Sequence, residues 1–164
     1  MSTEILLRIL FTGAGATLCM DGWALLLRRK WGIASLDYAL PGRWLLGMLK
    51  GKFVHRTILN APALTGEKVT GWAFHYATGI LFAFLPLLLS GPRWFHAPDF
   101  GTAMVTGLIS LAAPFFIMQP ALGFGMAASA TPNPAKARLK SLLTHLVFGC
   151  GLYLSAMLAA ALIT

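Results

Sequence analysis

Four polar side chains interrupt otherwise apolar stretches of this sequence, and they are of types that bind ligands or transfer protons. They are Asp21, His75, Gln119 and His145. A carboxylate and imidazoles can relay protons, as chains of Asp and His do in pumps and transporters. Polar groups of this kind cost free energy inside a bilayer, so by default they face a protein interior or a water-filled cavity. We therefore take these four residues as a candidate binding or proton-relay site.

The stretches around these residues are long enough to cross a membrane as helices. About 30 Å of hydrocarbon requires about 20 mostly apolar residues. Four stretches qualify, and they cover about residues 5–27, 70–90, 101–128 and 139–163. Their length and the lack of period-two alternation favour helices over strands. The sequence therefore predicts an all-α protein with one domain over residues 1–164, a four-helix transmembrane bundle.

The composition supports this prediction and excludes several classes of protein. Apolar residues make up 57% of the 164 residues and charged residues only 11%, whereas a soluble domain has about 25% charged residues. So few charges cannot cover the surface of a water-soluble globule. An ordinary cytosolic enzyme and a soluble nucleic-acid-binding module are both excluded. Among the classes that remain, we favour a protein that is not an enzyme, and we assign no cofactor.

The net charge of +8 is distributed very unevenly between the segments that connect the spans. Eleven of the 13 basic residues lie in the first and third connections, namely Arg28, Arg29, Lys30, Arg43, Lys50, Lys52, Arg56, Lys68, Lys136, Arg138 and Lys140. Only Arg8 and Arg93 fall on the other side. The positive-inside rule then places both termini in the periplasm of a bacterial inner membrane. We expect the basic side to attract anionic lipid heads rather than nucleic acid.

The first basic connection contains a second candidate element, a short amphipathic helix within residues 41–53. Trp44, Leu45, Met48 and Leu49 share one helical face, and basic residues flank them. This pattern predicts a helix lying in the membrane interface. The alternative is a segment packed against the end of the bundle.

A weak internal repeat relates the two predicted hairpins. Thr12-Gly13 of the first span matches Thr106-Gly107 of the third, and the pattern His-x-x-x-Gly starts at both His75 and His145. Both hairpins start on the same side of the membrane, so a duplication would give a parallel repeat. Chance matches in apolar sequence are the alternative.

Each predicted span carries one of the four polar residues at a similar depth. With a rise of about 1.5 Å per residue, Asp21 lies roughly 9 Å from the cytoplasmic end of its span and His75 roughly 8 Å from the end of its own. His145 and Gln119 fall in the same third of theirs. We therefore predict that the four side chains converge near the cytoplasmic side of the bundle.

Several functions are compatible with such a cluster. The leading hypothesis is a small transport or permeation protein that passes a proton, an ion or a small solute. In a structural or accessory subunit, the same residues would lock the helices together through hydrogen bonds. A metal such as iron or zinc on Asp21, His75 and His145, or a haem held by the two histidines, would indicate a redox protein. A homo-oligomer or a larger complex is compatible with such a small bundle.

The sequence also resembles a known family across nearly its whole length. The matching motifs are ATLCMDGWALLLRR at 16–29, SLDY at 35–38, GRW at 42–44, HY at 75–76, MQP at 118–120, TPNP at 131–134 and THLVFG at 144–149. They resemble the bacterial membrane-protein family known as domain of unknown function 2938. The resemblance implies a bacterial membrane protein with four spans. It implies no particular activity, and no site residue is carried over from it.

Overall fold

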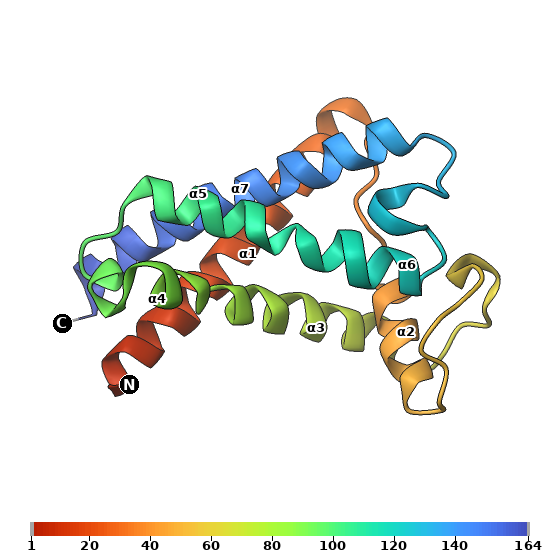
Figure 1. Ribbon diagram of the computed structural model, residues 1–164, viewed down its shortest axis with the longest axis horizontal. Helices are drawn as coiled ribbons and strands as arrows, with labels where there is room; N and C mark the ends of the chain where they lie inside the picture. Colours follow the sequence, from red (N-terminus) through yellow and green to blue (C-terminus); the bar gives the residue numbers. More distant parts are fainter. Residues whose placement is uncertain (1, 164) are drawn as a thin grey trace. The chain divides into compact units, whose positions relative to one another are not determined.

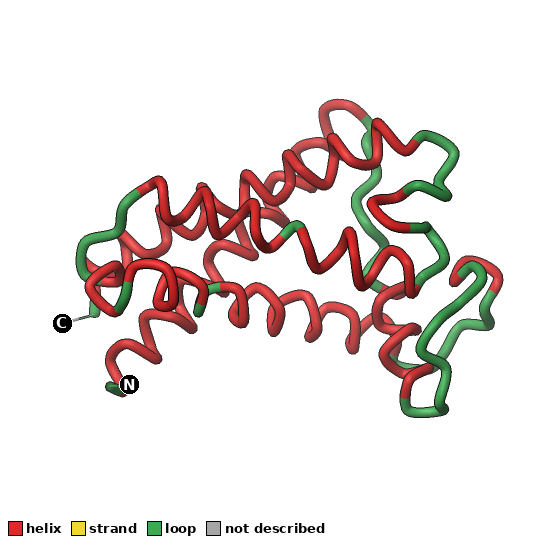
Figure 2. Tube along the Cα trace, viewed as in Figure 1, coloured by secondary structure: helices red, strands yellow, loops and turns green. Residues whose placement is uncertain are grey.

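The computed structural model describes residues 2–163, and within this range the chain is helical with no strand (Figures 1 and 2). Four helical stretches are long and apolar enough to cross a membrane: Thr3–Trp31, Glu67–Ser90, Phe100–Ala121 and Pro134–Leu162. The predicted all-α class with four candidate membrane helices is therefore confirmed. The α-helices are α1 (Thr3–Trp31), α2 (Ala39–Met48), α3 (Glu67–Phe82), α4 (Leu85–Ser90), α5 (Phe100–Ser110), α6 (Gln119–Ala121) and α7 (Pro134–Leu162). Shorter turns are η1 (Ile58–Asn60), η2 (Pro92–Phe95), η3 (Pro114–Met118, a π-helix) and η4 (Met126–Ala128).

Helices α1 and α7 begin before the apolar runs, because their first turns are capped by residues outside those runs. The Ser2 hydroxyl accepts a hydrogen bond from the amide of Ile5 at the start of α1. At the other end Gly32 adopts a left-handed conformation, and three basic residues fill the last turn of the helix, as the helix dipole favours. In α7 the Asn133 side chain accepts from the amide of Lys136, and Pro134 suits the first helical position.

The third span is shorter than predicted. It ends at Ala121 rather than near residue 128. Gly123 and Gly125 follow with φ of 86° and 73°, a left-handed backbone region that interrupts a helix and that glycine adopts without strain. Both glycines are visible in the sequence as interruptions of this stretch, but the predicted span was extended past them because the residues up to 128 are also apolar.

The structure divides into two compact units. The first unit comprises the chain up to Ser35, Tyr76–Ser110 and the chain from Leu142 onward. The second comprises Leu36–His75 and Leu111–Ser141. Each unit has its own hydrophobic core, and each is described separately below.

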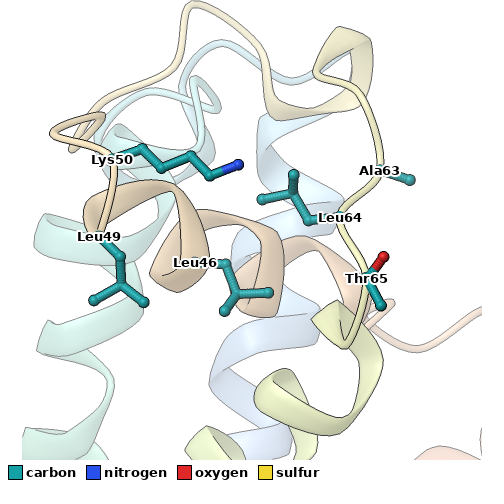
Figure 3. A pocket seen from close by; sticks show the side chains of 6 residues that line it. All are labelled: Leu46, Leu49, Lys50, Ala63, Leu64 and Thr65. Atoms are coloured by element: carbon teal, nitrogen blue, oxygen red, sulfur yellow. The ribbon is translucent and has the colours of Figure 1, made fainter.

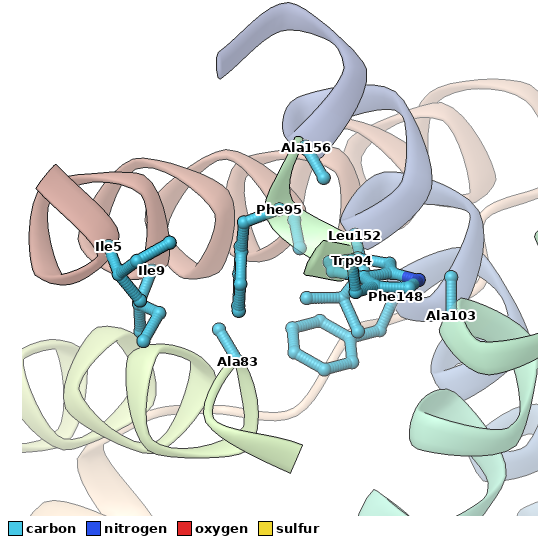
Figure 4. Close-up of a cluster of buried hydrophobic side chains, with 10 residues drawn as sticks. Ile5, Ile9, Ala83, Trp94, Phe95, Ala103, Phe148, Leu152 and Ala156 are labelled. Carbon is cyan, nitrogen blue, oxygen red and sulfur yellow. The ribbon is translucent and has the colours of Figure 1, made fainter. Parts of the chain in front are cut away.

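In the first unit, the helices approach one another at glycines. A methyl group added at Gly13 of α1 would lie 2.5 Å from the Cα of Ile80 in α3. One added at Gly151 of α7 would lie 2.9 Å from the Cα of Ala16 in α1. Small residues permit this close packing of membrane helices. The buried cluster beside these crossings is drawn in Figure 4 and consists of Ile5, Ile9, Ala16, Ala83, Trp94, Phe95, Ala103, Phe148, Leu152 and Ala156.

Two further close approaches in this unit join the glycines that define the sequence repeat. In the first hairpin, a methyl group added at Gly13 would lie 3.0 Å from the carbonyl oxygen of Gly79. In the second, one added at Gly107 would lie 3.0 Å from the Cα of Gly149. The Thr-Gly motif of one helix thus meets the glycine of the His-x-x-x-Gly motif of the next helix in both hairpins. This equivalence supports the predicted parallel repeat.

In the second unit, α2 packs against the first turns of α3 at two facing glycines, Gly42 and Gly71. A methyl group at Gly42 would overlap the carbonyl oxygen of Glu67. Beside this contact Arg43 donates from Nε to Glu67 Oε2 at 2.8 Å and from Nη2 to Oε1 at 2.9 Å. The same guanidinium also donates to the carbonyl oxygens of Ile58 and Ala61. A bidentate, charge-assisted pair of this kind fixes the geometry of the two helices.

The short helix predicted after the first span is confirmed as α2. The apolar residues predicted to share one face differ in burial, however. Trp44 is buried, packs with Ile58 and Leu122, and donates from Nε1 to the carbonyl oxygen of Phe53. It therefore belongs to the core of the second unit, as in the packed alternative. Leu49 in contrast is 84% exposed.

Candidate functional site

Asp21 lies in a hydrogen-bonded pair between two membrane helices of the first unit. The hydroxyl of Tyr76 in α3 donates to Asp21 Oδ2 in α1 at 2.9 Å, and both residues are half-buried. Asp21 is ten residues before the end of α1 at Trp31, or about 15 Å along the helix axis. It thus lies deeper in its helix than the sequence estimate, because α1 is longer than the apolar run.

His145 is held by a serine of the neighbouring helix in the same unit. Its Nδ1 lies 2.8 Å from Ser110 Oγ, and that hydroxyl donates its proton to the carbonyl oxygen of Gly107 at 2.7 Å. With the hydroxyl proton used in this way, Nδ1 must be the donor to Ser110. The neutral imidazole then has its lone pair on Nε2, the form that can accept a proton.

His75 belongs to an aromatic group in the second unit. Its Nε2 lies 2.9 Å from the hydroxyl of Tyr38, and the two rings have centroids 4.4 Å apart. The ring of Trp72 lies 4.4 Å from that of Tyr38. The imidazole is therefore orientated both by a phenol and by ring packing.

Gln119 follows an irregular segment of the third span, also in the second unit. The preceding residues Pro114–Met118 form a π-helix, and the amide of Gln119 donates to the carbonyl oxygen of Pro114. Such π segments often occur at functional sites. The side-chain oxygen Oε1 of Gln119 is buried and has no hydrogen-bond partner. A buried acceptor in this state calls for a donor such as a water molecule or a ligand.

The four predicted residues thus fall into two pairs by location. Asp21 and His145 lie in the first unit, and His75 and Gln119 in the second. Their convergence in one bundle interior stays a prediction. Within the described residues 2–163, no three His, Cys, Asp or Glu side chains are grouped closely enough to hold a metal ion. We therefore propose no metal site.

Three partners of these residues were missed by the sequence reasoning, namely Tyr38, Tyr76 and Ser110. Tyr38 precedes α2 in the first connection, and Tyr76 and Ser110 are single polar residues of apolar helices, so their types carried no signal. Adjacency offered a weak clue at one position only, because Tyr76 follows His75 directly in the sequence.

A buried arginine was also missed. Arg8 in α1 is only 3% exposed, and its Nη1 donates to the carbonyl oxygens of Phe95 and Ala159, each at 3.1 Å. Its Nη2 donates to the carbonyl oxygen of Ile163, and its Nε pairs with Glu4 at 2.8 Å. The spacing of four residues between Glu4 and Arg8 was a usable signal for the ion pair, but nothing in the sequence indicated the carbonyl partners.

His55, in the loop after α2, was missed as well. It is 5% exposed, its amide donates to the carbonyl oxygen of Ala121 at 2.8 Å, and its Nε2 is buried without a partner. Burial lowers the pKa of this imidazole below its usual 6.5, and the charges of Lys52 and Arg43 act in the same direction.

Four long apolar helices carrying polar pairs at their interfaces define a multi-pass, all-α membrane protein. The family described as "Protein of unknown function (DUF2938)" matches residues 10–159, and the chain belongs to this family. The match confirms the resemblance found in the sequence. No curated protein matches the chain. No solved structure matches it either.

Proposed function

We propose that the chain forms a single-domain permeation or transport protein of the bacterial inner membrane that passes a proton, an ion or a small polar solute. Asp21, His75, Gln119 and His145 line its polar path. The observation that carries this proposal is the pair of Asp21 and Tyr76, a carboxylate held by a phenol inside membrane helices. Ionisable residues at such positions typically mark substrate or proton pathways.

His145 adds a second proton-accepting group to the same unit. It lies eleven residues from the start of α7 at Pro134, or about 16 Å along that helix, and Asp21 lies about 15 Å from the end of α1. The two helices are in backbone contact where Gly151 meets Ala16. A carboxylate and an imidazole at matching depths on adjacent helices are suited to proton transfer.

We further propose that both termini are periplasmic. Eleven basic residues lie in the first and third connections or in the helix ends that adjoin them, and they support this orientation. On the other side, Arg8 is buried and occupied by carbonyl oxygens, so it does not act as a loop charge. The comparison of basic residues is then between exposed Arg93 on the periplasmic side and eleven residues on the cytoplasmic side.

The test is proton flux into vesicles that contain the purified protein and a trapped pH-sensitive dye, together with a swelling assay for small solutes. We expect Asp21→Asn to abolish pH-dependent flux and Tyr76→Phe to reduce it, with unchanged thermal unfolding. Asp37→Asn is the matched control, because Asp37 lies in a loop and caps α2. Wild-type vesicles that are no more permeable than empty ones, in both assays, would refute the proposal.

The second candidate function is a structural or accessory subunit, in which these residues only hold the helices together. It is favoured by the observation that Asp21 and His145 each hydrogen-bond to a neighbouring helix. Such bonds contribute about 0.6 kcal/mol each in membranes. In this case Tyr76→Phe, which removes the donor to Asp21, lowers the unfolding temperature and changes no flux.

A further inference from the structure

An amphipathic recess lies in the second unit, between the end of α2 and the loop that leads into α3 (Figure 3). It has a volume of about 370 Å³ and is lined by Leu46, Leu49, Lys50, Ala63, Leu64 and Thr65. This volume is within the range of small-molecule sites. The recess belongs neither to the polar pairs described above nor to the proposed path.

The lining combines an apolar surface with a single positive charge. Leu46, Leu49 and Leu64 supply the apolar part, and Lys50 extends from the end of α2 toward Leu64 (Figure 3). A lysine with an apolar stem and an ammonium head is suited to the boundary between hydrocarbon and water. The complementary ligand is a molecule with a hydrocarbon chain attached to an anionic group.

No acidic side chain of this unit is available to neutralise Lys50. The sequence of the second unit has two acidic residues, Asp37 and Glu67. Glu67 is held by Arg43 and by the amide of Leu64, while Asp37 accepts from the amide at the start of α2. The same stretch of chain, residues 50–68, carries further exposed cations, namely Lys52, Arg56 and Lys68. Its charge is therefore complementary to an anion.

The surroundings of the recess are those of a surface that meets lipid. Leu49 is 84% exposed, Val54 67% and Leu59 63%, and large apolar groups with cations between them are typical of membrane-interface segments. The lining residue Thr65 lies two residues before α3, which begins a candidate membrane span at Glu67. The recess is thus at the membrane boundary of that helix.

We propose that this recess binds one anionic phospholipid, with an acyl chain against the three leucines and the phosphate at the Lys50 ammonium. The proposal goes beyond permeation and does not depend on it, because none of the lining residues belongs to the polar path. It assigns a specific lipid site to a basic connection that would otherwise attract lipid heads only by its net charge.

The test is native mass spectrometry of the full chain in detergent, titrated with phosphatidylglycerol or with phosphatidylcholine of the same acyl chains. We expect one phosphatidylglycerol to be retained in preference to phosphatidylcholine. Lys50→Gln should weaken phosphatidylglycerol binding about fivefold, the effect of one surface cation, and leave phosphatidylcholine binding unchanged. Leu49→Ser should weaken both lipids. The matched controls are Lys52→Gln and Leu59→Ser, which are exposed neighbours outside the recess.

Other results would overturn the proposal. Equal retention of the two lipids, or an equal loss in Lys50→Gln and Lys52→Gln, would indicate no specific site. Equally tight binding of glycerol phosphate would indicate an anion site without a lipid chain, and lipid-sensitive dimers would indicate a second copy as the occupant. If either variant fails to fold, the unfolding temperature of the wild type is measured against lipid concentration instead. A lipid that binds the folded protein raises this temperature as its concentration increases. Equal stabilisation by the two lipids then overturns the proposal.

Discussion

Replacing Arg8 tests most directly what holds the first unit together. We predict that Arg8→Met, which fills similar space without donors, destabilises the protein strongly. The guanidinium donates to the carbonyl oxygens of Phe95 and Ala159, and both residues are fully buried. Water therefore cannot replace the lost donors. Glu4 in contrast is exposed enough to be hydrated after its partner is removed.

The size of the effect follows from these contacts. A hydrogen bond from a charged donor contributes about 1.5–3 kcal/mol. Loss of two such bonds to buried carbonyls, one of which keeps its helical partner at Ile163, gives a loss of about 3 kcal/mol. For a chain of this size it corresponds to a fall of roughly 6–12 °C in unfolding temperature.

The assay is thermal unfolding in detergent, followed by tryptophan fluorescence. Arg8→Lys should give an intermediate value, because the ammonium keeps the charge but cannot reproduce the planar fork. Arg93→Met is the control, since Arg93 is an exposed cation of η2. A difference of less than about 2 °C between Arg8→Met and the wild type would be well below the fall derived above. In that case the carbonyl contacts do not stabilise the fold and the reasoning is wrong.

Three further predictions concern other parts of the chain. Gly42→Ala should destabilise by about 1–3 kcal/mol because its methyl group would overlap the Glu67 carbonyl oxygen, whereas Gly22→Ala, with nothing within 4 Å of the added methyl group, should be neutral or slightly stabilising in thermal unfolding. The lowered pKa of His55 means that the unfolded chain binds a proton more readily, so unfolding temperature should fall as pH drops below about 6.5, and His55→Gln should reduce that slope. Asp99 caps α5 by accepting from the third amide of the helix at 2.8 Å, and Asp99→Ala should cost about 1 kcal/mol, with Asp99→Asn near wild type in chemical unfolding.

The four spans could be predicted from sequence because the transfer of an apolar helix into lipid depends on its local composition. The recurring motifs of Gly13 and Gly107 were visible in the sequence, but their contacts with Gly79 and Gly149 were not predicted, because they depend on how the helices pair. The helix ends were less accessible, because they depend on caps such as Ser2 and Asn133 and on the left-handed Gly123. A hydropathy window averages over these single residues.

The candidate site was predicted only in part. Residue type alone identified Asp21 and His145 as costly groups in lipid, and the structure gives each a partner on another helix. The partners of Arg8 could not be predicted, since they are backbone carbonyls 87 to 155 residues away. Every residue has a carbonyl, so the sequence contains no mark of which ones an arginine will meet.

The buried arginine also has a consequence for biogenesis. Arg8 belongs to α1, whereas its partner Ala159 in α7 is synthesised 151 residues later. At 5–20 residues per second, this interval lasts about 8 to 30 seconds. Throughout it, the guanidinium of Arg8 lacks the carbonyl oxygens of Ala159 and Ile163 that it binds in the folded protein. Synthesis of α7 is therefore the step that completes the hydrogen bonding of this buried charge.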